Sequence, residues 1–532
     1  MSDDETRAGD ALERVRADLR RASGKRRLDV ILSQREPAAL VRALPADELY
    51  LTIREIGLGD AVELVQLATP AQFRTFLDLA CWSGDHLAPR KALPWLRAAR
   101  AGATESPRAS SRWRAKLNGI DAELLYLVLR ETLAIHDLER DPDPHLTTER
   151  FMRTPEGKYV VEFHAEGTEY MAVRGILDDL YAEDPFRATR LLSSIRWDLP
   201  SELEEAALRW RTGRLADLGY PSLEEALSWF ARPAARTSGP AGTPARAPGF
   251  YLERIGTGSL LARAAARLTP AERDHLELEL VTAANAILVA DAVDPGDPDA
   301  VRAAVAGGRA FVEMGLEPEA GADEARAAEV LATTAVKALF QRGFGRVLEL
   351  KWRAERLLSS GRAGTRDRPW LDAPLGEAVA ALARRRPLYY PGLELPRDEW
   401  GSIAAAASTP RGFLSSAEVA RTQEALALAE EVADVAAALG LAPGGGGTMG
   451  AAYLTALANE RLGRSFSAEP LPRDEVAAAA AVLQDVDEAR LRPHGRAGAL
   501  LAGLARRRAE ELAPIRDGRI VRPEHVSALL VR

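Results

Sequence analysis

Cysteine, lysine and long apolar runs are scarce in this sequence of 532 residues, and the scarcity of cysteine and of apolar runs each excludes a class of protein. Cys81 is the only cysteine, so an intramolecular disulfide and a thiolate metal cage are both excluded. No apolar stretch reaches the roughly 18 residues that would span a bilayer. The polar, acidic start from Met1 to Thr6 lacks the basic and apolar regions of a signal peptide. We therefore expect a cytoplasmic protein without an integral membrane segment.

The positive charge of the chain comes almost entirely from arginine. The formal net charge is −8, and nucleic-acid binding requires a concentrated basic surface that neutralises phosphates. We therefore expect no nucleic-acid partner. The few lysines lie at positions 25, 91, 116, 158, 337 and 351.

What the sequence does contain is a regular succession of helix starts. Segments 44–48 and 68–72 each place a proline at the beginning of a short amphipathic helix, and a third start lies between them at Gly59-Asp60. Thr69 is a good N-cap, Pro70 fits the first helical position, and Gln72 can complete a capping box. Helices of about three turns are marginal alone, so they must pack against one another.

The same punctuation recurs along the chain. Thr269 and Glu272 repeat the cap spacing, as do Ser201 with Glu204 and Ser222 with Glu225. We predict an all-α fold of short helical hairpins stacked in a superhelical or irregular array. One small β-hairpin is expected near 151–163, where a Thr-Pro-Glu-Gly turn is followed by strand-forming residues.

Breaks in composition predict the domain organisation. The best linker is 231–249, which is rich in Pro, Gly, Ala and Arg and cannot bury much apolar surface. We expect a polar helix or tail over 1–27, a helical-repeat domain over 28–100, a helical domain with the β-hairpin over 113–230, the linker, a helical domain over 250–360 and a C-terminal helical domain over 370–532. A short helix from Glu524 is expected to dock through an apolar stripe that includes Leu529 and Leu530.

Three stretches carry a resemblance to a known family. Residues 49–57, 77–82 and 211–221, taken together, resemble signature segments of an uncharacterised bacterial family, domain of unknown function 6178. The N-terminal part is also similar in rhythm to the helical superhelix domain of MgtE-type magnesium transporters, although their transmembrane helices and nucleotide-sensing domains have no counterpart here. The first resemblance implies a soluble bacterial setting and supplies no catalytic residues.

Candidate chemistry in the chain is sparse. Glu272 and His275 have the spacing found in dimetal bundles, but no second pair accompanies them, and Glu272 is already explained by the capping box. His275, Thr282 and Asn285 lie on one helix and could line a polar pocket closed by the segment at Tyr389. For Asn285, a hydrogen bond that fixes helix packing is the favoured interpretation. We expect no metal and no cofactor.

Other motifs are better explained by structure. The segment 81–86 gathers a thiol, an acid and an imidazole, yet a buried structural cysteine beside an exposed turn is favoured. The glycine run 444–447 lacks the lysine and the preceding strand of a phosphate-binding loop, so we interpret it as a flexible connector. The arginine runs 384–386 and 506–508 are expected to be solvated helix ends.

Two functions of different class remain. The first is a cytoplasmic scaffold whose stacked helices expose a concave surface to a protein partner, motivated by the lack of a catalytic grouping. The alternative is a ligand-responsive or enzymatic protein with a polar pocket near the helix 271–292. Because no catalytic grouping is evident, the sequence favours a protein that is not an enzyme.

Overall fold

The computed structural model describes residues 24–231, 258–443, 447–518 and 527–532. Most of these residues are helical, which confirms the predicted all-α class. They form two compact units: unit 1 comprises 24–231, 258–308 and 331–337, and unit 2 comprises 309–330, 338–443, 447–518 and 527–532. No helix of the described part is both long enough and apolar enough to cross a membrane.

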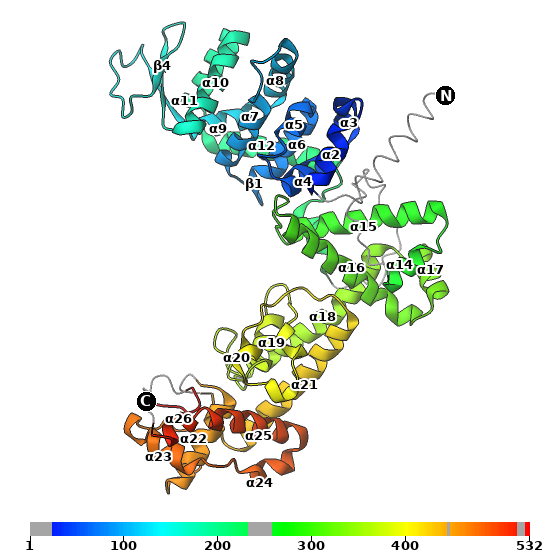
Figure 1. Cartoon of the computed structure of the whole chain (residues 1–532), viewed down its shortest axis with the longest axis vertical. Helices are drawn as coiled ribbons and strands as arrows, with labels where there is room; N and C mark the ends of the chain where they lie inside the picture. The colour runs from blue at the N-terminus through cyan, green and yellow to red at the C-terminus, as the bar shows by residue number, and fades with distance from the viewer. Residues whose placement is uncertain (1–23, 232–257, 444–446, 519–526) are drawn as a thin grey trace. The chain divides into compact units, whose positions relative to one another are not determined.

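Unit 1 is built from antiparallel helices that follow one another closely in sequence. Figure 1 shows α2 to α12 side by side, with β4, α10 and α11 together at one end. The helices are α2 (Gly24–Leu32), α3 (Pro37–Ala43), α4 (Ala46–Ile56), α5 (Val62–Leu67), α6 (Pro70–Ala80), α7 (Ala92–Arg100), α8 (Pro107–Gly119), α9 (Ala122–Arg130), α10 (Gly167–Glu183), α11 (Pro185–Trp197), α12 (Pro200–Asp217), α13 (Leu223–Ser228), α14 (Leu260–Ala265), α15 (Pro270–Ala290) and the start of α16 (Pro298–Ala320), with a 3-10 turn, η1 (Pro89–Lys91).

The capping box at Thr69 shows how a local signal also sets the packing of unit 1. The Thr69 hydroxyl accepts from the backbone N–H of Gln72, and the Gln72 side chain accepts from the backbone N–H of Thr69. The same side chain donates to the carbonyl oxygens of Val41 and Leu44, at 2.7 and 2.8 Å. Gln72 therefore helps to begin α6 and also links this helix to the end of α3.

The other three predicted capping boxes had different outcomes. Those at Thr269 and Ser222 are present and begin α15 and α13. The one at Ser201 is wrong, because α12 begins earlier, at Pro200, with Leu199 as its N-cap. The Glu204 carboxylate instead accepts a hydrogen bond from the backbone N–H of Leu87, at 2.9 Å. A tertiary contact has taken the place of the local cap.

Two small antiparallel sheets interrupt the helices of unit 1. The predicted hairpin is present as β4 (Phe151–Arg153) and β5 (Tyr159–Phe163), but β3 (Leu133–Asp137) pairs with the other side of β5 and makes a three-stranded sheet in the order β3-β5-β4. A second pair, β1 (Trp82–Ser83) and β2 (His86–Leu87), follows α6. The sequence did not predict β1, β2 or β3.

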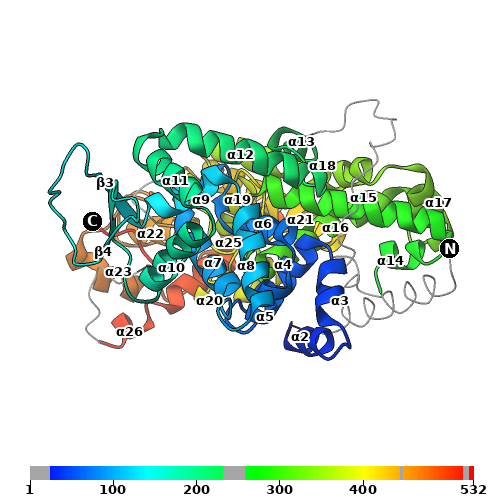
Figure 2. The same ribbon diagram turned by 90° about the horizontal axis from the view of Figure 1, so that it is seen from above.

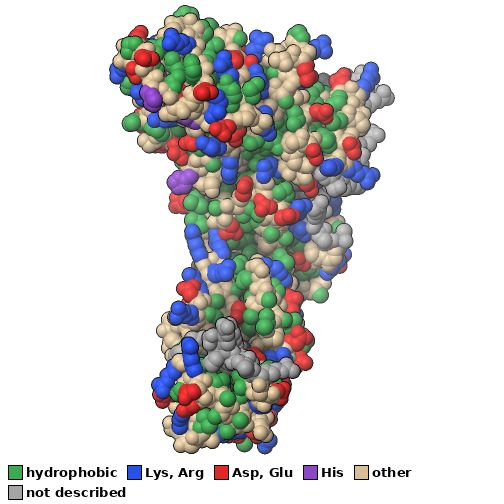
Figure 3. Space-filling model, turned by 60° about the vertical axis from the view of Figure 1, so that its left-hand side comes forward, with side chains coloured by type: hydrophobic (Ala, Val, Ile, Leu, Met, Phe, Trp, Pro, Cys, Tyr) green, Lys and Arg blue, Asp and Glu red, His purple; other side chains and the backbone are tan. Residues whose placement is uncertain are grey.

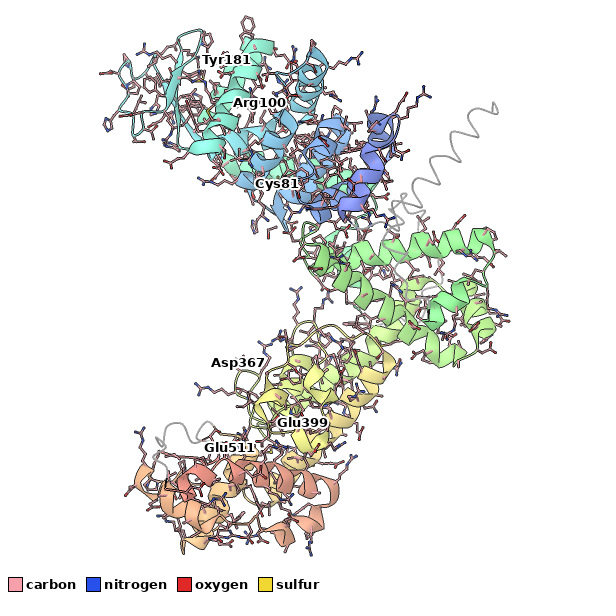
Figure 4. The ribbon with its side chains drawn as sticks, in the orientation of Figure 1. Cys81, Arg100, Tyr181, Asp367, Glu399 and Glu511 are labelled. Atoms are coloured by element: carbon pink, nitrogen blue, oxygen red, sulfur yellow. The ribbon has the colours of Figure 1, made fainter. Side chains whose placement is uncertain are left out.

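Partly buried charges and polar groups join the helices of unit 1. Asp179 of α10 accepts from Arg100 of α7 and from the indole N–H of Trp113, both at 2.7 Å. Figure 4 labels Arg100 on α7 and Tyr181, which follows Asp179 on α10. Figure 2 shows α9 and α11 next to α12, consistent with the packing of α9 against both helices. The unit is therefore held by polar contacts as well as by its apolar core.

Unit 2 contains the rest of the helices. Its elements are the remainder of α16, most of α17 (Glu324–Thr333), most of α18 (Val336–Ser359), α19 (Leu375–Leu382), α20 (Ile403–Ala406), α21 (Ser416–Ala438), α22 (Met449–Arg461), α23 (Val476–Val482), α24 (Glu488–Leu491), α25 (Gly495–Glu510) and α26 (Ala513–Arg516), with the 3-10 turns η3 (Pro391–Glu394), η4 (Arg397–Glu399), η5 (Arg473–Glu475) and η6 (Arg492–His494).

Two glycines let α16 and α18 touch backbone to backbone in unit 2. A Cβ atom at Gly343 would lie 1.9 Å from the carbonyl oxygen of Phe311, and one at Gly315 would lie 1.9 Å from that of Leu339. The rings of Phe311, Phe340 and Phe344 pack beside this crossing. Only glycine fits at these two positions without moving the helices apart.

The C-terminal residues dock as predicted, but those that the structure describes are not helical. Leu529 and Leu530 are buried. The Leu471 N–H donates to the carbonyl of Leu530 at 2.8 Å, and the Arg532 N–H donates to the carbonyl of Leu471 at 3.0 Å. Backbone bonds of an extended segment, and not a helical face, therefore fix the end of the chain. Parts of three other predictions lie outside the described residues: residues 1–23 of the polar helix or tail over 1–27, most of the 231–249 linker, and residues 444–446 of the glycine run.

Candidate functional site

The candidate residues on α15 are engaged in ordinary helix contacts. His275 is largely exposed, and its Nε2 lies 3.8 Å from Oε1 of Glu279. The Thr282 hydroxyl donates to the carbonyl of Leu278 in its own helix, at 3.0 Å. Asn285 is buried and donates to the carbonyl of Gly219 at 3.1 Å, so it links α15 to the turn after α12. Its Oδ1 has no hydrogen-bond partner among the described residues.

Tyr389, the fourth candidate, belongs to unit 2, whereas the other three belong to unit 1. Its backbone exchanges two hydrogen bonds with Arg411, at 2.7 and 3.0 Å. Its buried ring lies under the Arg411 guanidinium, 4.9 Å from the ring centroid, and beside the ring of Phe413. The backbone and the ring therefore fix this side chain in place.

The Tyr389 hydroxyl reaches a group of charged side chains. It donates to Oε1 of Glu394 at 3.0 Å and accepts from Nη1 of Arg421 at 3.0 Å. Burial raises the pKa of Tyr389 to about 12, although the hydrogen bond from Arg421 opposes this effect. The hydroxyl therefore keeps its proton at neutral pH and remains a donor.

Arg411 joins the tyrosine to α21. Its guanidinium donates to both carboxylate oxygens of Glu418, at 2.9 and 3.2 Å, and Glu418 also accepts from the backbone N–H of Leu414. Glu394 lies nearby on η3, with Oε1 at 3.8 Å from Nη2 of Arg411 and 3.8 Å from Nη1 of Arg421. We call these five residues, Tyr389, Glu394, Arg411, Glu418 and Arg421, the Tyr389 cluster. In Figure 4 the labelled Glu399 marks the neighbouring turn η4.

A second feature that the sequence analysis did not single out lies on the outer side of α11. Ala188, Leu191, Leu192 and Ile195 are buried, whereas Phe186 is 87% exposed, Trp197 is 46% exposed and Arg190 is exposed. These three exposed residues follow the helical spacing i, i+4 and i+11, so they share one face. We call them the α11 stripe.

Arginines surround the Trp197 end of this stripe. The guanidinium carbons of Arg140 and Arg196 lie 4.4 and 4.9 Å from a ring centroid of Trp197. Within the part of the chain that the structure describes, neither these two arginines nor Arg190 forms an ion pair with a carboxylate. The sequence of α11 contains no acidic residue, and Asp184 before it is occupied in capping its first turn.

Two of the three segments that suggested a family meet in unit 1. Arg214 donates to both carboxylate oxygens of Asp78, at 2.7 and 2.8 Å, and to Asp121, at 2.6 Å. Arg211 lies over the ring of Trp82, 5.1 Å from its centroid, and donates to the carbonyl of Asp78. Residues 77–82 and 211–221 are thus bound to each other through α6 and α12.

Cys81, which Figure 4 labels, adjoins this network and is fully buried. Burial, with a further contribution from the nearby Asp78, raises the pKa of the Cys81 thiol to about 12. His86 lies in the exposed turn of the β1–β2 pair. The sequence prediction of a structural cysteine is therefore confirmed, because a nucleophile needs an accessible thiolate.

The family model of DUF6178, a family of unknown function, matches residues 5–517. The chain belongs to this family. No curated protein and no solved structure matches it. The expected resemblance of the N-terminal part to MgtE-type transporters has no support from these comparisons. Membership of DUF6178 assigns no activity and no catalytic residue to the chain.

In this DUF6178 chain, no three His, Cys, Asp or Glu side chains of the described ranges are grouped so as to hold a metal ion. Of the predicted site residues, only Tyr389 lies in a convergent group of charges. No local sequence pattern groups its partners Glu394, Arg411 and Arg421 with it, because turns and the start of α21 separate them along the chain. The α11 stripe did have a signal, namely aromatic residues placed on the helix face opposite its apolar core.

Proposed function

We propose that this protein is a non-enzymatic interaction protein of the bacterial cytoplasm and that the α11 stripe binds an acidic segment of a partner protein. The observation that carries the proposal is the combination of two exposed aromatic residues with three arginines that have no carboxylate partner among the described residues. Tryptophan and arginine are the residues most enriched at the centres of protein interfaces.

The distribution of exposed apolar side chains supports this part of unit 1 as the contact region. Isolated exposed apolar residues are common, but seven of the ten large ones among the described residues lie between β4 and α13 in the sequence. They are Phe151, Met171, Phe186, Trp197, Leu199, Trp210 and Leu223. The three arginines make a partner with carboxylates the complementary one, since an arginine fork binds a carboxylate with two hydrogen bonds.

Arginine beside tryptophan is also how proteins hold single-stranded nucleic acid. The net charge of −8 favours a protein partner, because unspecific phosphate binding needs an extended basic surface. On the face shown in Figure 3, basic side chains alternate with acidic and apolar ones. We therefore propose the acidic protein segment and treat nucleic acid as an outcome of the test.

The test measures binding of three fluorescent probes to the full-length protein: a peptide rich in Glu and Leu, the same peptide with Lys in place of Glu, and a single-stranded oligonucleotide. We expect the Glu peptide to bind best and its affinity to fall by about tenfold or more in the double variant Arg190→Glu, Arg196→Glu. Trp352→Ala is the control, because Trp352 is an exposed tryptophan that lies on α18 and not on α11. Equal binding of the Lys peptide, unchanged affinity in the double variant, or preference for the oligonucleotide would overturn the proposal.

A further inference from the structure

The Tyr389 cluster directs three hydrogen-bond donors toward one carboxylate oxygen. Oε1 of Glu394 lies 3.0 Å from the Tyr389 hydroxyl and 3.8 Å from a guanidinium nitrogen of each of Arg411 and Arg421. Only the first distance is a hydrogen bond, since the other two are too long. The two arginines thus attract this oxygen by charge, but neither donates a hydrogen bond to it.

The two glutamates of the cluster differ in how firmly they are held. The Glu418 side chain is 9% exposed and accepts hydrogen bonds from both sides of the Arg411 guanidinium and from a backbone N–H. The Glu394 side chain is 49% exposed and lies at the end of a 3-10 turn of four residues. Rotation of its side chain is enough to move Glu394 into solvent, whereas Glu418 is fixed.

Arg421 retains free binding capacity. Its side chain is 43% exposed, and within the described residues its hydrogen bond is to the Tyr389 hydroxyl. A guanidinium presents five N–H donors in a planar fork, so most of those on Arg421 remain available to a second acceptor. The ring and backbone contacts of Tyr389 keep its hydroxyl in place before any ligand arrives. This lowers the entropic cost of binding.

We propose that the Tyr389 cluster binds a small ligand through an anionic carboxylate or phosphate group, and that Glu394 occupies this position in the free protein. The charge balance of the cluster supports replacement of the Glu394 carboxylate by the anionic group of a ligand. The two arginines are now neutralised by two glutamates, so a monoanion that displaces Glu394 restores the same balance. The site lies in unit 2 and does not depend on the proposed role of the α11 stripe.

Removing the internal carboxylate should strengthen binding. In Glu394→Ala the competitor is absent, and we expect the affinity of the full-length protein for the ligand group to rise by about tenfold, because the site is no longer occupied by its own side chain. Titration calorimetry with sodium acetate and with inorganic phosphate, at constant ionic strength, measures this. Tighter binding of acetate would identify a carboxylate ligand, and tighter binding of phosphate would identify a phosphate ligand.

Two further variants separate binding at the site from general charge effects. Arg421→Gln should abolish binding in the Glu394→Ala background, because it removes the open guanidinium. Arg397→Gln is the matched control, since Arg397 of η4 pairs with Glu424 of α21, outside the cluster. Circular dichroism checks the fold of each variant. If Glu394→Ala binds neither anion more tightly than the natural protein, or if Arg421→Gln leaves binding intact, the site does not exist.

Discussion

At the scale of single residues, the most unusual group is the carboxyl of Asp47 in the first turn of α4. The side chain is buried, Oδ1 accepts from the N–H of Glu48, and Oδ2 has no hydrogen-bond partner in the described part of the chain. Burial raises the pKa of Asp47 to about 7, although backbone hydrogen bonds oppose the shift. The folded protein therefore holds this proton more tightly than the unfolded chain does.

The linkage between this proton and folding has a definite sign. Stability from the protonated carboxyl is fully present below the ordinary pKa of 3.8 and is lost as the pH rises through about 7. Asp47→Asn keeps the group neutral at every pH. We expect the variant to be more stable than the natural protein by up to about 4 kcal/mol near pH 8, with the difference vanishing near pH 4. Urea unfolding at both pH values measures it, and a difference independent of pH would contradict this account.

Local signals were predictable where only neighbouring residues take part. Thr69 and Gln72 form their capping box because both groups lie in the same turn. Ser201 and Glu204 have the same spacing, yet Glu204 binds the backbone of Leu87, which lies 117 positions away. Sequence spacing contains no information about such a competitor, and this is why one prediction was right and the other wrong.

At the scale of elements, the crossing of α16 and α18 depends on the absence of two side chains. A methyl group at position 343 would overlap the carbonyl oxygen of Phe311, so the helices would have to separate and lose the packing around them. We expect Gly343→Ala to lower the free energy of unfolding by about 3 kcal/mol or more.

Gly345→Ala is the matched control for this substitution. Gly345 lies on the same helix, and no atom lies within 4 Å of a Cβ atom built there. Because alanine favours the helix over glycine, this variant should be more stable by up to about 1 kcal/mol. Chemical unfolding of the two variants measures both effects. Equal losses in both would show that helix composition, and not the crossing, is responsible.

Strands were harder to predict than helices for a physical reason. A helix closes its hydrogen bonds within four residues, so α4 and α6 could be expected from the local pattern at 44–48 and 68–72. β3 pairs with β5, and His136 faces Val160, so its existence depends on a segment more than twenty positions away. The Tyr389 cluster follows the same rule, because it joins a turn, an extended segment and a helix that sequence proximity does not connect.

At the scale of the whole molecule, the chain divides into two compact units. Independent cores unfold independently unless an interface couples them. We expect calorimetry to resolve two transitions, with Asp47→Asn shifting only the transition of unit 1 and Gly343→Ala only that of unit 2. A single transition that both variants shift would instead mean that the two cores unfold together.

The ion pairs of Arg214 also have a consequence for the order in which the protein is made. Asp78 and Arg214 are separated by 136 positions, so the ribosome delivers the carboxylate long before its partner. At about 5 to 20 residues per second, the delay is on the order of ten seconds. During that time α6 contains an aspartate that cannot be buried without cost. Burial of Asp78 in the N-terminal core of the nascent chain is therefore costly until α12 has been synthesised.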